Sequence, residues 1–406
     1  MVEKRTALII AIIVILIGGG LSYYFFLMPR KPRADVIIWE DFLPAEEELT
    51  RQFIENSFRQ LYPNITVELV GVPDLRTRLL AALPAGKGPD LFMWAHDWTG
   101  EFAEAGFILP LDEFVTEDLK GKFLETAINA CMYNGHIYAL PFAAETVALV
   151  YNKEMVPNPP QNMSQLESIM QQYVMQGKYG IAYQVDPYFV SAWPHAFGGY
   201  YFRDEDKSVG VNNTETVEGI KYFMEHIKPY MSTGDTSREA QVAIFVDQKA
   251  PFLVDGPWGI GTLKQANLSI GVTLLPKIDE IDEWPRPYTG IKVVWMSSNV
   301  HDKEKAFTFM KWFVTNAEYI KQRALQLGFI PVLKEVLNDP EVQADEIVSA
   351  YAKQVELGIP MPKSKEMMKV WGPVGDAISE IFLEIKTADE ALDEAQRRIL
   401  ESLAGG

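Results

Sequence analysis

A strand, a helix and a second strand follow one another near the start of the globular sequence, and this order constrains the fold more than any other feature. VIIW at 36–39 is a short β-branched strand, 45–62 places apolar residues at helical spacing, and 65–70 is again strand-like. Such a unit is right-handed and pairs its strands in parallel. Another strand at 91–93 extends the pattern, so we predict an α/β fold with sheets covered by helices.

Length, charge and cysteine content limit the class of protein. A chain of 406 residues is longer than a single core usually supports, so we expect two domains. A formal net charge of −18 would repel a phosphate backbone, which argues against a nucleic-acid partner. The sole cysteine, Cys131, lies among apolar residues and is expected to be a buried thiol, and the histidines show no metal-ligand spacing. We expect no metal and no cofactor.

An uncharged run, residues 7–28, precedes the globular part of the sequence. As a helix it would extend roughly 33 Å, about the thickness of the hydrocarbon core of a bilayer. Lys4 and Arg5 precede it, and neither a small-residue cleavage site nor a cysteine for lipid attachment accompanies it. We therefore expect residues 1–34 to form an uncleaved membrane anchor and linker, with the rest of the chain outside the cell.

The stretch LPFAAETVALVYNK at 140–153 holds one acid, Glu145, in an otherwise apolar run. Val147–Tyr151 reads as a buried strand, and burying an unpaired carboxylate next to it would cost several kcal/mol. Two interpretations are open at this point. Glu145 is either a solvated loop acid or a hydrogen-bond acceptor in a cleft between two lobes.

Two tryptophan-rich turns follow predicted strands. WAHDWTG at 94–100 comes after the strand at 91–93, and ligands of open α/β sheets bind beyond the carboxyl ends of strands. The alternative is that Asp97 caps a helix while Trp94 and Trp98 fill the core. DGPWG at 255–259 also projects a tryptophan, and the missing GxxxxGK[ST] pattern argues against a phosphate loop there.

Several segments in the same order resemble the extracellular solute-binding proteins of ABC transporters, in the sugar-binding branch of maltose-, trehalose- and maltodextrin-binding proteins. The resemblance covers nearly all of residues 35–406. The matching segments are DLFMWAHDWTGEFAEAG at 90–106, LPFAAETVALVYNKEMVPNPP at 140–160, DPYFVSAWPHAFGGYYF at 186–202, DGPWGIG at 255–261, WGPVGDAI at 371–378 and TADEALDEAQRRI at 387–399.

The resemblance implies a bilobal periplasmic-binding-protein-like fold of type II, with two discontinuous lobes, mixed sheets and a hinged cleft. The first lobe would combine residues 35–143 and 289–341, and the second 147–286 and 345–406. The expected chain crossings at the hinge lie near 143–146, 287–289 and 339–344.

The resemblance also implies which residues bind the ligand. The corresponding positions are Trp94, Asp97 and Glu145 in the first lobe and Asp186, Tyr188, Trp258 and Trp371 in the second. Two departures from the family pattern extend the set. Trp98 stands where the family has an arginine, and the loop around Asp41 lacks the expected lysine, so we expect a more aromatic and less cationic cleft.

These residue types suit a neutral sugar, because flat aromatic rings cover its C–H faces while carboxylates accept hydrogen bonds from its hydroxyls. The expected function is capture of a disaccharide or oligosaccharide by a monomeric, non-enzymatic protein that delivers it to an ABC transporter permease. One alternative is a membrane-anchored secreted glycoside hydrolase acting through Glu145 and Asp97. Another is a ferric-ion receptor using Tyr188 and the pair Tyr200 and Tyr201.

Overall fold

The structure, a computed structural model, describes residues 33–405, and the chain from Asp35 onward forms one compact unit. A six-stranded sheet contains β1 (Val36–Glu40), β2 (Val67–Gly71), β3 (Leu91–Ala95), β6 (Ala139–Glu145), β11 (Tyr288–Met296) and β12 (Ile359–Pro360). A four-stranded sheet contains β7 (Ala148–Asn152), β8 (Ala182–Tyr183), β9 (Phe252–Asp255) and β10 (Ile270–Thr273). A short hairpin joins β4 (Met132–Tyr133) and β5 (His136–Ile137). We call the two larger sheets the first and the second sheet.

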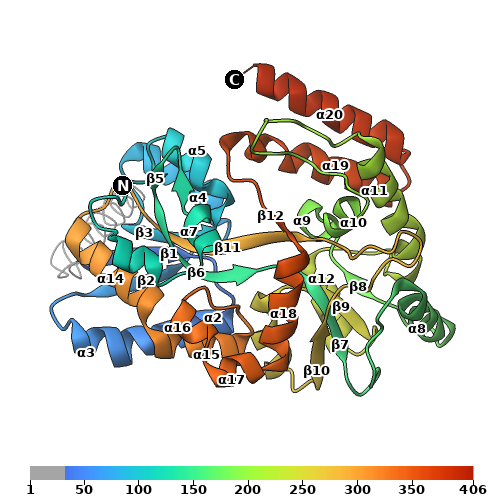
Figure 1. Ribbon diagram of the computed structural model, residues 1–406, viewed down its shortest axis with the longest axis horizontal. Helices are drawn as coiled ribbons and strands as arrows, with labels where there is room; N and C mark the ends of the chain where they lie inside the picture. Colours follow the sequence, from blue (N-terminus) through green and yellow to red (C-terminus); the bar gives the residue numbers. More distant parts are fainter. Residues whose placement is uncertain (1–32, 406) are drawn as a thin grey trace, which may run out of the picture. The chain divides into compact units, whose positions relative to one another are not determined.

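Helices surround both sheets (Figure 1). Those of the first half of the chain are α2 (Pro44–Phe53), α3 (Arg59–Leu61), α4 (Leu75–Ala82), α5 (Thr99–Glu104), α6 (Glu117–Gly121), α7 (Glu125–Ala130), α8 (Met163–Met175), α9 (Pro187–Val190) and α10 (Ala192–Ala196). Those of the second half are α11 (Thr214–His226), α12 (Arg238–Val246), α13 (Ile260–Gln265), α14 (Lys303–Thr315), α15 (Ala317–Leu327), α16 (Lys334–Leu337), α17 (Pro340–Ala344), α18 (Glu346–Leu357), α19 (Trp371–Phe382) and α20 (Ala388–Ala404).

The predicted strand–helix–strand unit is confirmed. β1 pairs in parallel with both β2 and β3, whereas β3 and β6 pair antiparallel with β11, so the first sheet is mixed. The helix predicted over 45–62 contains a π-helical turn at Ile54–Phe58, which separates α2 from α3. Phe58 in this turn is buried, but Leu61, the last residue of α3, is 64% exposed and does not join the buried face that the spacing predicted.

The segment around 198–202 forms no named strand in the described chain. Phe202 makes only an isolated bridge with Val209. Arg203 continues this short pairing through its amide, which donates to the carbonyl of Ser208. The segment is therefore a closed loop between α10 and α11.

The chain passes from the first sheet to the second directly after Glu145. β6 ends at Glu145, and β7 begins at Ala148 in the other sheet, so two residues link the strands. The chain returns to the first sheet in β11, which pairs with β6 over Gly290–Trp295 (Figure 1). α18 packs against β10, β6 and β7 and thus contacts strands of both sheets.

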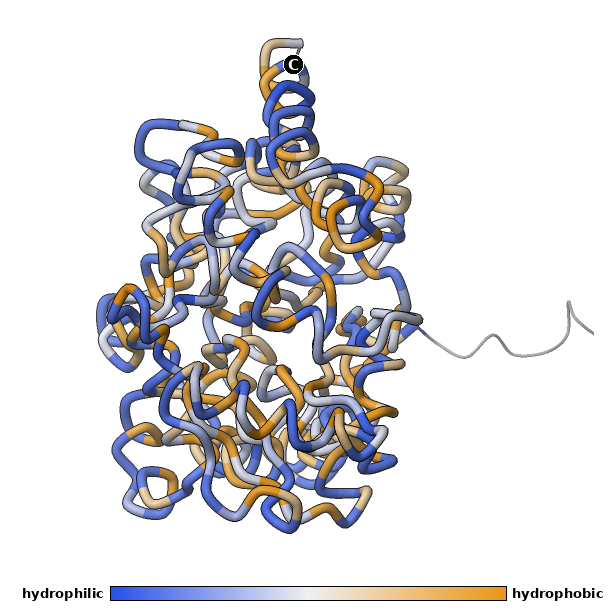
Figure 2. The backbone as a smooth tube through the Cα atoms, turned by 90° about the vertical axis from the view of Figure 1, so that its right-hand side faces the viewer, coloured by the Kyte–Doolittle hydropathy of each residue, from blue (hydrophilic) through white to orange (hydrophobic). Residues whose placement is uncertain are grey.

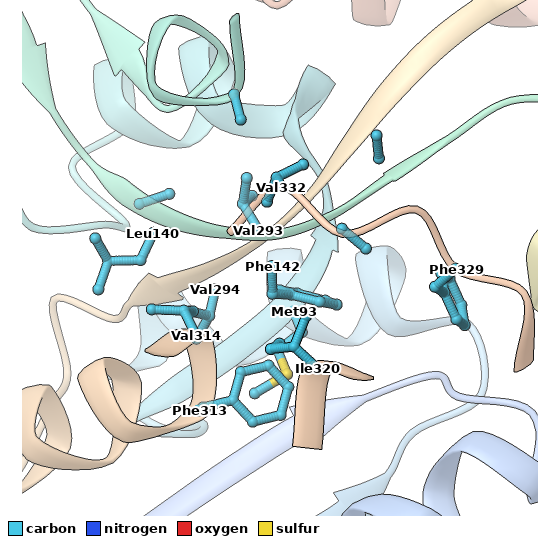
Figure 3. Close-up of a cluster of buried hydrophobic side chains, with 14 of the residues drawn as sticks. Met93, Leu140, Phe142, Val293, Val294, Phe313, Val314, Ile320, Phe329 and Val332 are labelled. Atoms are coloured by element: carbon cyan, nitrogen blue, oxygen red, sulfur yellow. The ribbon is translucent and has the colours of Figure 1, made fainter. Parts of the chain in front are cut away.

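The hydrophobic core is continuous from the first sheet onto one face of the second. Figure 3 shows its centre, where Phe142 of β6 and Val293 of β11 lie among side chains of α14 and α15. Ala148 and Val150 of β7 extend this cluster, whereas the intervening Leu149 packs into another cluster beneath α19 and α20. Successive side chains of a strand point to opposite faces, so β7 separates the two clusters.

The C-terminal helix closes the second cluster. Thr387 and Glu390 form a reciprocal capping box at the start of α20, which satisfies backbone donors at the helix end. Along the helix, buried residues recur at helical spacing at Ala391, Leu392, Ala395 and Ile399. In Figure 2 the helix that ends at the C label shows blue, hydrophilic turns, in keeping with its charged outer face. The C-terminal segment therefore packs as an amphipathic helix against the second cluster.

The segment expected to anchor the chain, residues 7–28, lies outside the described residues. Within residues 33–405, no helix combines the length and apolar character needed to cross a bilayer. Cys131 is a free, buried thiol, as predicted, and burial raises its pKa.

Candidate ligand-binding pocket

A pocket of about 530 Å³ opens at the carboxyl ends of strands from both sheets. Its walls combine aromatic rings with carboxyl groups, which is the composition that the sequence indicated for a sugar site. The lining residues from the first-sheet side are Asp41, Leu43, Glu46, Trp94, Ala95, Asp97, Glu145 and Lys292. Those from the second-sheet side and the C-terminal segment are Gln184, Asp186, Pro187, Tyr188, Phe189, Arg238, Glu239, Trp258, Met361 and Trp371.

Asp97 and Glu145 place buried carboxyl groups on the first-sheet wall. Asp97 follows β3 in a short 3₁₀ turn and is 6% exposed, and Glu145 is the last residue of β6 and is 5% exposed. Among the described residues, neither Asp97 Oδ1 nor Glu145 Oε2 has a hydrogen-bond partner. Glu145 is therefore not a solvated loop acid. The N-cap of α5 is Trp98, so Asp97 does not cap that helix either.

Burial perturbs both acids. Desolvation, reinforced by the charge of Glu145, raises the pKa of Asp97 to about 7. Desolvation also raises the pKa of Glu145, and the nearby ammonium group of Lys292 opposes this shift. A ligand hydroxyl that donated to these oxygens would replace the water that they lost on burial.

Lys292 is a pocket cation that the sequence analysis missed. It lies on β11 beside a bulge in the pairing with β6, and its side chain is 13% exposed. Its Nζ lies 3.6 Å from Glu145 Oε2 and 4.4 Å from the centroid of the Trp94 ring. The register places Lys292 opposite Ala95 and Ala143, a relationship that cannot be read from local sequence.

Three tryptophans form a stacked column behind this wall. Trp98 stacks on Trp94, with ring centroids 5.2 Å apart, and on Trp295, with centroids 6.2 Å apart. Trp94 borders the pocket, whereas Trp98 is buried behind it. The structure thus gives Trp98 a core position, and its ring supports Trp94.

The second-sheet wall is aromatic. Trp258, in the turn after β9, packs against Tyr188 and Phe189 with ring centroids 6.3 and 6.2 Å away. Trp371, the first residue of α19, packs edge-on against Tyr288 at 5.7 Å. The hydroxyl of Tyr188 has no hydrogen-bond partner among the described residues, so this wall also offers an unused polar group.

Asp186 orients the start of this wall. Its carboxyl accepts a hydrogen bond of 2.8 Å from the amide of Tyr188 and thereby caps α9, whose first residue is Pro187. Desolvation raises the pKa of Asp186, and the amides of Tyr188 and Phe189 oppose this shift. Asp186 therefore fixes the position of Tyr188 besides lining the pocket.

A second cation, Arg238, was also missed. Its guanidinium forms two hydrogen bonds to the buried Asp255, of 3.0 and 2.6 Å. Asp255 also accepts from the amide of Gly256 at 2.9 Å, so the pair holds the turn that carries Trp258. Arg238 begins α12, and no local sequence pattern indicates its contact with Asp255.

Asp41 and Glu46 complete the acidic side. Asp41 lines the pocket from an exposed position after β1, and partial desolvation raises its pKa. Glu46 accepts a hydrogen bond of 2.6 Å from Arg323, which is buried among Phe142, Phe329 and other rings. The carboxyl of Glu46 is thus paired, unlike those of Asp97 and Glu145.

His96 joins the pocket wall to the C-terminal segment. Its Nδ1 accepts from the amide of Ile291 at 3.1 Å, so Nε2 carries the proton and donates to the carbonyl of Met361 at 3.0 Å. Burial lowers the pKa of His96 to about 4. The ring is therefore neutral at physiological pH and holds Met361, a pocket residue, beside β11.

The residues considered for ferric-ion binding lie in different surroundings. Tyr200 stacks on the guanidinium of Arg203, Tyr201 packs on Tyr288, and Tyr188 faces Trp258. Within the described chain, no group of three His, Cys, Asp or Glu side chains could hold a metal ion.

Comparison with known proteins identifies the family. The family model described as bacterial extracellular solute-binding protein matches residues 55–350, which are more than half of the chain. The chain belongs to this family. Its members are binding proteins, so the chain is a solute-binding protein and not a glycoside hydrolase.

Similar curated proteins cover most of the sequence. A maltotriose-binding protein of Pyrococcus abyssi is 46% identical over 377 residues, which are 91% of this chain and 83% of that protein. A maltodextrin-binding protein of Bacillus subtilis is 25% identical and covers 88% of each chain. A galactooligosaccharide-binding protein of the same species is 26% identical over 77% of this chain and 76% of its own.

Solved structures agree with the fold of this solute-binding protein. The maltotriose-binding protein of Thermus thermophilus, bound to maltotriose, has a TM-score of 0.82 at 26% identity and covers 91% of this chain and all of its own. A maltose/maltodextrin-binding domain of Bdellovibrio bacteriovorus has a TM-score of 0.83 at 23% identity and covers 91% and 99%. The α/β periplasmic-binding-protein fold is thereby confirmed.

Proposed function

We propose that this solute-binding protein captures a maltooligosaccharide, with maltotriose as the leading candidate, and delivers it to the permease of an ABC transporter. The observation that carries the proposal is the pairing, in one pocket, of unpartnered buried acceptors on one wall with half-buried, pocket-lining aromatic rings on the other. Glucose units present the complementary features, hydroxyls at the rim and apolar C–H faces. The similarity to maltotriose-binding relatives supports the same choice.

The residues divide between two tasks. Asp97, Glu145 and Asp41 accept hydrogen bonds from sugar hydroxyls, and Trp94 borders the same hydroxyls. Tyr188, Trp258 and Trp371 pack against sugar rings, with Asp186 holding Tyr188. Trp98 contributes by supporting Trp94 from behind.

The pocket lies where two sheets meet, which supports a bilobal, hinged mechanism of the type II fold. In this proposal the lobes are residues 35–143 with 289–341 and residues 147–286 with 345–406. Ligand that contacts both walls favours the closed state, because its binding energy differs between the open and the closed states. The closed monomer then docks on the permease.

The N-terminal run at 7–28 supports attachment to the outer side of the cell membrane. The family description, an extracellular solute-binding protein, is consistent with that side. Fractionation of cells before and after alkaline carbonate washing tests the anchor. Protein released by the wash would contradict a membrane-spanning segment.

Titration calorimetry of residues 33–406 tests the ligand. Maltotriose should bind with a stoichiometry of one, whereas galactooligosaccharides, trehalose and xylooligosaccharides rank the specificity. Binding of trehalose but not of maltotriose would replace the proposed ligand. Absence of binding to every neutral saccharide would overturn the sugar-binding function.

A further inference from the structure

Lys292 occupies an unusual place in the pocket, between an aromatic ring and a carboxylate. Its Nζ lies 4.4 Å from the centroid of Trp94 and 3.6 Å from Glu145 Oε2. The second distance is that of an ion pair and exceeds the range of a hydrogen bond. At this distance the N–H donors of the ammonium group are not committed to Glu145 and can reach another acceptor.

Trp94 does not present a free ring face to the pocket. Trp98 stacks against it at a centroid distance of 5.2 Å with the planes inclined by 17°. An ammonium group 4.4 Å from the same centroid must lie on the opposite face, since the first face is covered. Over the Trp94 ring, the group that faces a bound sugar is consequently the ammonium of Lys292.

The other polar groups of this wall are acceptors. Asp97 and Glu145 each hold a buried oxygen without a hydrogen-bond partner among the described residues, and Glu46 is paired with Arg323. The other pocket cation, Arg238, is engaged by Asp255 through two hydrogen bonds. Lys292 is thus placed to donate where the neighbouring groups accept.

We infer that Lys292 is a specificity-determining ligand residue, which donates to a sugar hydroxyl that at the same time donates to Glu145. A hydroxyl group can do both, whereas a ring oxygen, a glycosidic oxygen or a deoxy carbon cannot. The Lys292–Glu145 pair therefore selects for a free hydroxyl at one position of the bound saccharide. This inference rests on the proposed sugar-binding function and assigns to it a residue that the family resemblance did not.

The single cysteine of the chain allows a direct test. Cys131 is buried and free, so a cysteine introduced by Lys292→Cys can be alkylated selectively with 2-bromoethylamine. The thiolate sulfur displaces bromide and forms a thioether, which restores an ammonium group at nearly the length of lysine. A fold defect would not be repaired in this way.

We expect Lys292→Cys to weaken maltotriose binding by about 10- to 100-fold, the range for losing a hydrogen bond to a charged group. Aminoethylation should recover most of that loss in calorimetry. Lys178→Met is the matched control, because its Nζ also lies over a ring, that of Tyr173 at 5.9 Å, and Lys178 does not line this pocket. A crystal structure with maltotriose should show Lys292 Nζ within hydrogen-bond distance of a hydroxyl that also contacts Glu145.

The outcomes separate two failures. If the unmodified protein binds no neutral saccharide, the proposed function is wrong, and this inference, which rests on it, is wrong as well. If it binds maltotriose and Lys292→Cys binds equally well, the inference alone is overturned. A weakened variant that aminoethylation does not restore also overturns it, since the ammonium group is then not what the ligand requires.

Discussion

Trp94 and Trp98 stack with their ring planes inclined by 17°, yet of the two it is Trp94 that borders the pocket. Trp98 stacks in turn on the fully buried Trp295, at an interplanar angle of 5°. The wall of the binding site is therefore continuous with the core. Changes to the buried members of this column should reach the ligand through Trp94.

Replacing the middle ring of the column tests this connection. Trp98→Ala should lower the free energy of unfolding by about 3–5 kcal/mol, the usual cost of removing a buried aromatic side chain. It should also weaken ligand binding, because Trp94 loses the ring that it stacks on. Urea unfolding and calorimetry measure the two effects. Trp98→Phe should retain most of the stability and most of the ligand affinity. Full affinity in the folded fraction of Trp98→Ala would show that Trp98 does not act on the ligand through Trp94.

The aromatic rings of the second-sheet wall should contribute directly to affinity. Trp258→Ala and Trp371→Ala should each cost on the order of 1–3 kcal/mol of binding free energy, the value of burying an aromatic face. Calorimetry with maltotriose measures this cost. Trp312→Phe is the control, because Trp312 lies in the core cluster of the first sheet and its indole N–H has no hydrogen-bond partner among the described residues. Unchanged affinity in both alanine variants would remove these rings from the site.

Ligand affinity should increase with pH around neutrality. The pKa of Asp97 is raised to about 7, first by desolvation and then by the charge of Glu145. An ionised carboxylate accepts hydrogen bonds from hydroxyls, so protonation weakens binding as the pH falls below this value. Calorimetry between pH 8 and pH 5.5 should record the decrease. Asp97→Asn should bind more weakly at pH 8 but show a flatter profile, and an equally steep profile would assign the titration to another group.

The contribution of Glu40 to stability should decrease as the pH rises, whereas ligand affinity should increase. This residue is fully buried at the end of β1, where desolvation raises the pKa of its carboxyl from 4.5 to about 7. The folded state therefore binds a proton that the unfolded state releases, so the contribution of Glu40 to stability is lost as the pH rises from the unfolded to the folded pKa. Glu40→Gln should gain stability over the wild type at pH 8 and little or none at pH 4. Equal differences at both pH values in urea unfolding would contradict this assignment.

The pair of Arg238 and Asp255 should be essential to the turn that holds Trp258. Arg238→Ala leaves Asp255 buried without its cation, and breaking such a pair from one side costs about 3–5 kcal/mol. Thermal unfolding measures the loss. Arg238→Lys keeps the charge but not the two-pronged hydrogen bonding, and an intermediate stability is expected. A gain in stability for Arg238→Ala would show that Asp255 is protonated in the fold.

The sequence predicted the strands and helices well where periodicity was strong. The segments at 36–39 and 91–93 form β1 and β3, because their apolar residues pack into one core. The stretch at 45–62 is helical as predicted, but a π-helical turn at Ile54–Phe58 interrupts it, and apolar spacing alone does not reveal such a turn.

The candidate site was predictable on its acidic and aromatic sides and not on its cationic side. Asp97 follows β3 and Glu145 is the last residue of β6, and strand ends mark the ligand-binding edge of such sheets. Lys292 lies inside a strand and reaches the pocket because β11 pairs antiparallel with β3 and bulges against β6. The position of the Arg238 guanidinium is set by its hydrogen bonds to Asp255, which belongs to a different element of the fold. Such strand pairings and ion pairs are tertiary interactions, and local sequence patterns do not predict them.

The pairing of β6 with β11 has a consequence for how this protein could change its ligand. Glu145 and Lys292 stand on neighbouring strands of one sheet, opposite Gly290 and Ala143, so backbone hydrogen bonds fix their spacing before any ligand arrives. The aromatic residues Tyr188, Trp258 and Trp371 stand on turns and helix starts outside that sheet. The aromatic residues can therefore be substituted, by evolution or by design, to fit a different sugar chain. The pair of Glu145 and Lys292 keeps its spacing when they change.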